Sequence, residues 1–325
     1  MKPIFIAGSE RSGTTLLRLM LHSHPRIAIP PQTKYMKKIY KRRLMFGNLE
    51  NEKNRKKLAL WFNNNFNAST KIDDLNIELK EVIKEILSSK SLGAALAVPW
   101  NSYAKKHSKE RWGDKRPYYI HHMDKLRELY PDAQIIHMIR DCRDVIASLN
   151  DMPWWHKTFE YSILNWKSAI MHGLTARQNT KIDEYIELRY EDLITNPEYE
   201  LSRLCQFLGE EYNPAMLDFQ KTSEFSVPNY KMAWHGATRG PLNSRSVGRW
   251  KRDLTAYQIS LIQWAVGDEL FRLGYDLSKT EPLSIKHQMN FNLKKTKFKI
   301  EDLYRNFGDN IISLLYSGRL DYRIE

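Results

Sequence analysis

Cysteine is scarce in this sequence. It occurs twice, as Cys142 and Cys205, in different local contexts. There is no CxxC motif and no grouping of cysteine with histidine. Structural zinc sites and disulfide-stapled scaffolds both depend on such closely spaced sets. Neither class of protein is indicated.

Long apolar runs are also missing. No run approaches the roughly 18 residues that a membrane-spanning helix requires. The apolar segment "IFIAG" at residues 4–8 is short and leads into a loop. It indicates a buried strand rather than a signal peptide. We therefore expect a cytoplasmic protein.

Acidic residues are in the minority. The chain has 38 Asp and Glu against 51 Lys and Arg, which gives a formal net charge of +13. This excess favours anionic partners, such as phosphorylated or sulfated ligands, nucleic acid or anionic lipid. With 42% hydrophobic and 27% charged residues, the composition is globular and excludes a mostly disordered chain.

What the sequence does contain is an alternation of short apolar runs with helical periodicity. The runs predict strands at 3–8, 26–30, 133–140 and 185–193, and the periodicity predicts helices at 14–24, 123–130, 142–152, 158–179, 196–209 and 255–273. Strands that alternate with helices indicate a parallel sheet covered on both faces. We predict an α/β fold of the P-loop type, with three layers around a central parallel sheet.

Two segments fall outside this alternation. The stretch 33–110 is helical in pattern and opens with a basic run at 34–57, so we interpret it as an inserted lid. The segment 276–325 is helical and basic, and we interpret it as a C-terminal extension of a domain formed by residues 1–275.

The clearest motif is "GSERSGTT" at residues 8–15. A glycine-rich turn between a strand and a helix presents backbone N–H groups and a helix N-terminus to an anion. A nucleotide-binding P-loop has lysine after its second glycine, whereas here Thr14 follows Gly13. Arg11 supplies a cation within the loop instead. The plainer alternative is that these residues only cap a helix.

The extended segment "ERSGTTLLRLMLHSHP" at 10–25 resembles the 5′-phosphosulfate loop of sulfotransferases that use 3′-phosphoadenylyl sulfate (PAPS). The resemblance is strongest to the protein-tyrosine and bacterial branch. It implies PAPS as the donor, adenosine 3′,5′-bisphosphate (PAP) as the product, and no metal. It also implies that the donor is bound by the loop residues Arg11, Ser12, Gly13, Thr14 and Thr15.

Two further motifs resemble the part of this family that binds the 3′-phosphate. In "IRDCRDVIASL" at 139–149, the resemblance assigns the phosphate to Arg140 and Ser148. The later loop "NSRSVGRWKRDLT" at 243–255 corresponds to the loop that closes over the same phosphate. Its implied ligands are Ser244, Arg245 and Ser246, with Lys251 as a further candidate.

Two shorter segments complete the resemblance. "LRYEDLITNP" at 188–197 implies that Tyr190 lies near the adenosine. "RWGDKRP" at 111–117 implies that Lys115 points at the transferred sulfonate and acts in catalysis together with Arg11. The alternatives are a tyrosine packed in the core and a surface turn before a helix.

The expected catalytic base is missing. Where the tyrosine-sulfating branch has a glutamate, this chain has Gln32, and an amide does not accept a proton at neutral pH. The remaining candidates for a base are Asp114, His107, His156 and His235.

We therefore predict a sulfotransferase that moves the sulfonate of PAPS to a hydroxyl or amine of a small molecule, lipid or carbohydrate. The alternatives are a non-catalytic member of the fold that binds nucleotides or polyanions, and an atypical P-loop kinase, which the missing lysine disfavours. We expect no nucleic-acid partner. The sequence leaves peripheral contact with a membrane and the oligomeric state open.

Overall fold

The computed structural model of the chain describes residues 1–228, 230 and 240–317, with residues 304–317 described through their backbone alone. The chain forms two compact units. The first comprises residues 1–25 and 115–299, and the second comprises residues 26–114 together with the chain from residue 300.

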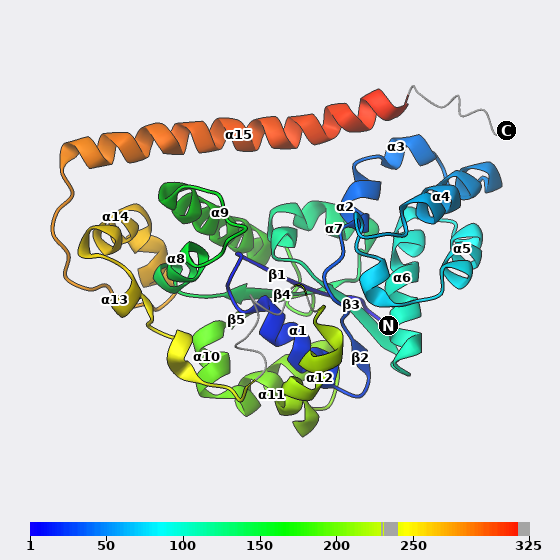
Figure 1. The fold of residues 1–325 in the computed structure, drawn as a ribbon, viewed down its shortest axis with the longest axis horizontal. Coiled ribbons are helices and arrows are strands. Elements are labelled where there is room, and N and C mark those ends of the chain that lie inside the picture. The colour runs from blue at the N-terminus through cyan, green and yellow to red at the C-terminus, as the bar shows by residue number, and fades with distance from the viewer. Residues whose placement is uncertain (229, 231–239, 318–325) are drawn as a thin grey trace. The chain divides into compact units, whose positions relative to one another are not determined.

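The fold is built on a five-stranded sheet (Figure 1). The strands are β1 (Ile4–Gly8), β2 (Ile27–Ala28), β3 (Arg111–Lys115), β4 (Gln134–Ile139) and β5 (Tyr185–Arg189), in the order β2-β3-β1-β4-β5. The pairs β1–β4, β4–β5 and β2–β3 are parallel. All five residues of β1 are buried, as expected for a central strand covered on both faces.

The helices of the first unit cover the sheet on its two faces, which gives the predicted three-layer α/β fold. They are α1 (Thr14–Ser23), α7 (Met123–Leu129), α8 (Cys142–Asn150), α9 (Phe159–Gln178), α10 (Tyr190–Thr195), α11 (Pro197–Leu208), α12 (Phe219–Ser226), α13 (Trp250–Asp253) and α14 (Ala256–Arg272). In Figure 1, α8 and α9 lie on one side of the strands, and α1, α11 and α12 lie on the other. No helix among the described residues is long and apolar enough to cross a membrane.

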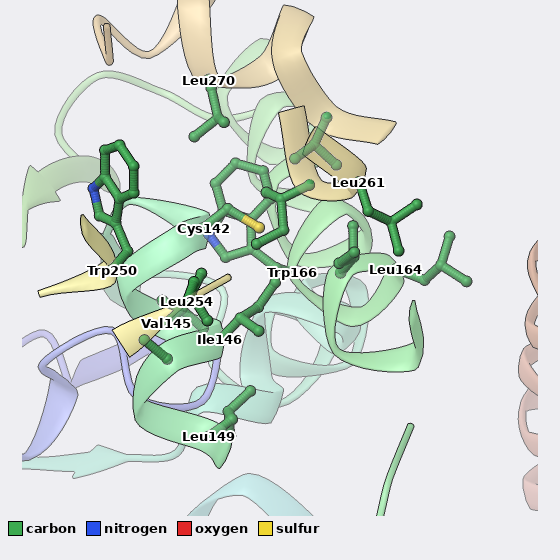
Figure 2. Packing of buried hydrophobic residues seen from close by; sticks show 14 of the residues in the cluster. Cys142, Val145, Ile146, Leu149, Leu164, Trp166, Trp250, Leu254, Leu261 and Leu270 are labelled. Atoms are coloured by element: carbon green, nitrogen blue, oxygen red, sulfur yellow. The ribbon is translucent and has the colours of Figure 1, made fainter. Parts of the chain in front are cut away.

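A buried apolar cluster holds α8, α9, α13 and α14 together (Figure 2). Trp166 of α9 and Leu261 of α14 pack with Cys142 at the start of α8. Trp250 of α13 belongs to the same cluster, so the chain that leads into α13 is fixed at that end. At the opposite end of α13, Thr255 and Gln258 form a capping box that starts α14.

The second unit is mainly helical. It contains β2, most of β3 and the helices α2 (Tyr35–Tyr40), α3 (Arg43–Phe46), α4 (Glu52–Asn65), α5 (Leu79–Ser88) and α6 (Leu92–Lys106). Its core is aromatic, since Trp100 lies 5.3 Å from the ring of Tyr35 and 5.1 Å from that of Trp112, measured between centroids. The last helix of the chain, α15 (Ile285–Ser317), begins in the first unit.

One local expectation is wrong, and one of the alternatives is ruled out. The strand expected at 185–193 ends at Arg189, and Tyr190 already begins α10. The segment 111–117 is not a surface turn, because Arg111–Lys115 forms β3 and most of that strand is buried. The sequence of this segment is too polar to predict a buried strand, yet the charged side chains of the strand are buried.

Candidate active site

The loop between β1 and α1 has an unusual backbone. Gly13 has φ +94° and immediately precedes Thr14, the first residue of α1. A Cβ at Gly13 would lie 2.9 Å from Cε2 of Tyr190 and nearer still to Cδ2, so only glycine fits under this ring. Gly13 offers no side-chain cap, and the first N–H groups of a helix have no partners within the helix. The loop therefore aims backbone donors at the space before α1.

Arg11 lies within this loop and has φ +65°. Its Nε donates a hydrogen bond of 2.9 Å to Oγ of Ser148 on α8. Burial, reinforced by the nearby charges of Arg140 and Arg249, lowers the pKa of Arg11 to about 10. The guanidinium is still charged at neutral pH, so the loop carries a fixed cation.

Arg140 follows directly after β4 and is buried. Its Nη1 donates to the carbonyl of Arg11 at 2.9 Å, and its Nη2 donates to the carbonyl of Ser246. The guanidinium lies 4.4 Å from the centre of the Tyr190 ring. Its Nε is buried and has no hydrogen-bond partner among the described residues. A buried cation with an unused donor is typical of a site for an anion.

Tyr190 connects the late loop to this cluster. Its hydroxyl is 2.6 Å from Oγ of Ser246. Ser244 and Arg245 precede Ser246 in one short turn and are exposed. Lys251 is also exposed, with its Nζ 5.6 Å from the centre of the Trp250 ring. Of these four late-loop candidates, Ser246 is the one with described bonds to Arg140 and Tyr190.

Asp144 is a residue of this site that sequence reasoning did not find. Its carboxylate accepts hydrogen bonds from the backbone N–H of Gly248 at 2.7 Å and of Trp250 at 3.0 Å. Burial raises the pKa of Asp144. The acid holds the late loop against α8. The signal in the sequence was the second aspartate of "RDCRD", but its partners lie about a hundred residues further along the chain.

The other arginine of that motif has a different task. Arg143 forms a buried ion pair with Asp141, with Nη2 and Oδ2 2.7 Å apart. Its guanidinium also covers the Trp250 ring at 4.0 Å. Arg143 thus holds the start of α8 and the end of the late loop together, and Arg140 is the arginine that joins the cluster around Arg11.

Lys115 adds a second cation beside the loop. It is the last residue of β3 and is buried, and its Nζ donates to Oγ1 of Thr15 at 3.3 Å. The side chains of Thr15 and Lys115 thus meet at the first turn of α1. Asp114 precedes Lys115 in β3 and is also buried.

The other candidates for a base lie in separate places. Gln32 is half-buried in the segment between β2 and α2 of the second unit. His107 is the C-cap residue directly after α6 in the same unit, and burial together with the charges of Lys109 and Lys106 lowers its pKa. His156 is exposed in the segment before α9. His235 lies outside the described residues.

Among the described residues, no group of three or more His, Cys, Asp or Glu side chains is arranged to hold a metal ion.

Comparison with known proteins identifies the class. Residues 3–214 match the model of the sulfotransferase family, which is more than half of the chain, and the protein belongs to that family. Protein-tyrosine sulfotransferase A of Caenorhabditis elegans is 25% identical over 293 residues, covering 86% of this chain and 68% of the relative. Protein-tyrosine sulfotransferase 1 of Danio rerio is 24% identical, covering 87% and 74%.

A bacterial relative is also similar in sequence, and two solved structures are similar in fold. The nodulation protein NoeE of Sinorhizobium fredii is 24% identical, covering 84% of this chain and 66% of NoeE. The sulfotransferase domain of the Synechococcus PCC 7002 olefin synthase has a TM-score of 0.60 at 21% identity, covering 86% of this chain and 96% of that domain. The sulfotransferase domain of the curacin pathway has a TM-score of 0.57 at 21% identity, covering 85% and 99%. These structures share the fold.

Proposed function

We propose that this sulfotransferase uses PAPS as its donor and transfers the sulfonate to the phenolic hydroxyl of a tyrosine in a protein or peptide, with release of PAP. The observation that carries the donor assignment is the cluster formed by Arg11, Arg140 and Ser148. The described hydrogen bonds of Arg140 go to two backbone carbonyls and none to a carboxylate. The buried charge of Arg140 and its unused Nε support an anionic ligand at this cluster.

The donor has two anionic ends, and the site has two sets of donors. We assign the 5′-phosphosulfate to the backbone N–H groups of residues 12–15 and to the hydroxyls of Thr14 and Thr15. We assign the 3′-phosphate to Arg140, Ser148 and the late loop at Ser246. The unused Nε of Arg140 supports this second assignment.

PAPS supplies an activated sulfonate. Its S–O bond to the phosphate breaks as the acceptor oxygen bonds to sulfur, and negative charge develops on the departing phosphate oxygen. We assign the stabilisation of that charge to Lys115, whose Nζ meets Thr15 at the first turn of α1, and to Arg11, which lies in the loop before α1. Thr15 orients the Lys115 ammonium through its hydroxyl.

The choice of a phenol rests on two supports. The relatives include enzymes named as protein-tyrosine sulfotransferases. A phenol has a pKa near 10 and loses its proton far more readily than an alcohol, so it depends less on a strong base. The net charge of +13 further favours acceptors with acidic residues around the tyrosine.

Two measurements test the proposal. Titration calorimetry should show PAP binding without a divalent metal, and Arg140→Ala should weaken that binding about 10- to 100-fold, the range for losing charge-assisted hydrogen bonds. Arg177→Ala removes an exposed arginine and serves as the matched control. Absence of PAP binding by the unmodified protein contradicts the donor assignment.

The acceptor is tested with ³⁵S-labelled PAPS and three acceptor pools: tyrosine peptides with acidic flanks, the same peptides with phenylalanine for tyrosine, and a mixture of oligosaccharides and lipids. Label in the first pool alone supports the proposal. Label in the third pool alone assigns a carbohydrate or lipid hydroxyl instead.

A further inference from the structure

One face of helix α15 packs against the first unit. Phe291 is buried, and its ring packs edge-on against Trp264 with centroids 5.5 Å apart. Phe298 packs in the same way on Tyr161 at 5.1 Å. Between them, Lys294 pairs with Glu160 at 2.8 Å. These contacts orient the helix about its own axis.

The opposite face carries apolar side chains that stay in solvent. Ile285, Met289 and Leu293 are 75%, 62% and 71% exposed. At about 100° per residue, spacings of four place the three within one stripe. The same geometry puts the centre of this stripe about half a turn from Phe291 and Phe298. Ile300 and Leu303 continue the stripe and are also exposed.

Lysines border this stripe on both sides. By the same helical geometry, Lys286 and Lys297 lie along one edge, and Lys299 lies along the other. The nearby acids, Glu301 and Asp302, fall on the side of the helix away from the stripe. The apolar stripe is thus framed by positive charge.

We propose that α15 is a membrane-surface helix that places this stripe on an anionic lipid bilayer. Helices that lie in the headgroup region combine an apolar face with flanking lysines, whose stems reach along the apolar surface while their ammonium groups meet the lipid phosphates. A second copy of the chain is a poorer occupant. Helices that pair through such a stripe use opposite charges along its edges, and here both edges carry lysine.

The full-length protein should cosediment with vesicles of phosphatidylcholine containing about one third phosphatidylserine, and far less with phosphatidylcholine alone. Met289→Glu/Leu293→Glu should weaken the binding at least about tenfold, because each apolar side chain contributes to burial in the interface. Ile182→Glu is the matched control, since Ile182 is 93% exposed but lies outside α15. It should bind as the unmodified protein does.

Calorimetry with PAP separates this inference from the proposed function. The Met289→Glu/Leu293→Glu variant should bind PAP normally, which also shows that it is folded. Failure of the unmodified protein to bind anionic vesicles would overturn the inference, as would equal binding by the stripe variant. Light scattering that shows a dimer lost in that variant would assign the stripe to a second copy and overturn it as well.

Discussion

At the scale of single residues, Gly13 faces two separate constraints. Its φ of +94° disfavours any residue with a side chain, and the Tyr190 ring occupies the space that a Cβ would need. Gly13→Ala should therefore lower the free energy of unfolding by about 2–4 kcal/mol, since backbone strain and steric overlap add. Urea denaturation followed by circular dichroism measures this change.

A second glycine separates the two constraints. Gly209 ends α11 with φ +74°, and an added Cβ there would meet nothing within 4 Å. Gly209→Ala should lower the free energy of unfolding by about 1 kcal/mol, because only the backbone strain at positive φ applies there. An equal decrease in the free energy of unfolding for Gly13→Ala and Gly209→Ala would show that the steric overlap with Tyr190 does not contribute.

The sequence could suggest which residues form the site, but not which atoms contact one another. Arg11 could be proposed from the glycine-rich loop, whereas Arg140 and Ser148 were proposed because "IRDCRDVIASL" resembles a motif of the family. The detailed contacts could not. Ser246 receives Arg140 on its carbonyl and Tyr190 on its hydroxyl, and no local pattern distinguishes these atoms. Such contacts join residues far apart in the chain, so they are fixed by packing rather than by propensity.

At the scale of elements, Asp144 joins α8 to the late loop through two backbone hydrogen bonds. Asp144→Ala should release the loop at Gly248 and Trp250, because both N–H groups lose their acceptor. We expect PAP affinity to fall about tenfold, because a released loop no longer positions Ser246. This factor corresponds to the free energy of one or two hydrogen bonds. Calorimetry measures the affinity, and hydrogen exchange measures protection of the two amides.

The conservative variant tells positioning from simple damage to the fold. Asp144→Asn keeps one acceptor oxygen and should recover part of the affinity and of the protection at one of the two amides. Loss of affinity with unchanged exchange at Gly248 and Trp250 would contradict a positioning role for Asp144.

Some helices and strands could be predicted from the sequence more accurately than others. β1, α1, β4 and α8 were predicted close to their observed bounds, because a buried parallel strand is a short apolar run and an amphipathic helix repeats every three to four residues. β3 was missed because "RWGDK" is polar. Its charges are tolerated inside by partners that the fold supplies, as Thr15 does for Lys115.

Lys109 gives an element-scale test in the second unit. Its Nζ donates to the carbonyl of Ile27 in β2 at 3.1 Å, and burial lowers its pKa from 10.5 to about 8. Below pH 8 the folded protein carries this buried charge at a cost. Between pH 8 and about 10.5 the unfolded chain binds more protons, so stability rises with pH through that window.

The free energy of unfolding of Lys109→Met should therefore exceed that of the unmodified protein by most below pH 8. This difference should shrink as the pH approaches 10. Urea denaturation of the two proteins at pH 7, 8, 9 and 10 measures it, and the other titrating groups cancel in the comparison. A difference that is constant across this range would mean that the burial of Lys109 does not shift its titration.

At the scale of the whole molecule, we expect the net charge to act on the proposed donor before any contact forms. The net charge of +13 is spread over a chain with 51 basic residues. PAP and PAPS are polyanions, so the field of the protein should attract them toward a site that already holds Arg11 and Arg140. The contacts then set how long the ligand stays.

This separation predicts how salt affects binding. The association rate of PAP should fall about tenfold between about 20 mM and 300 mM salt, because screening shortens the reach of the field from tens of ångströms to a few. The dissociation rate should change much less, since the buried contacts of Arg140 are poorly screened. Stopped-flow fluorescence with the native tryptophans measures both rates, and neutral adenosine, whose association should be nearly independent of salt, is the control. An association rate that does not respond to salt would show that the positive charge lies too far from the path of the donor to steer it.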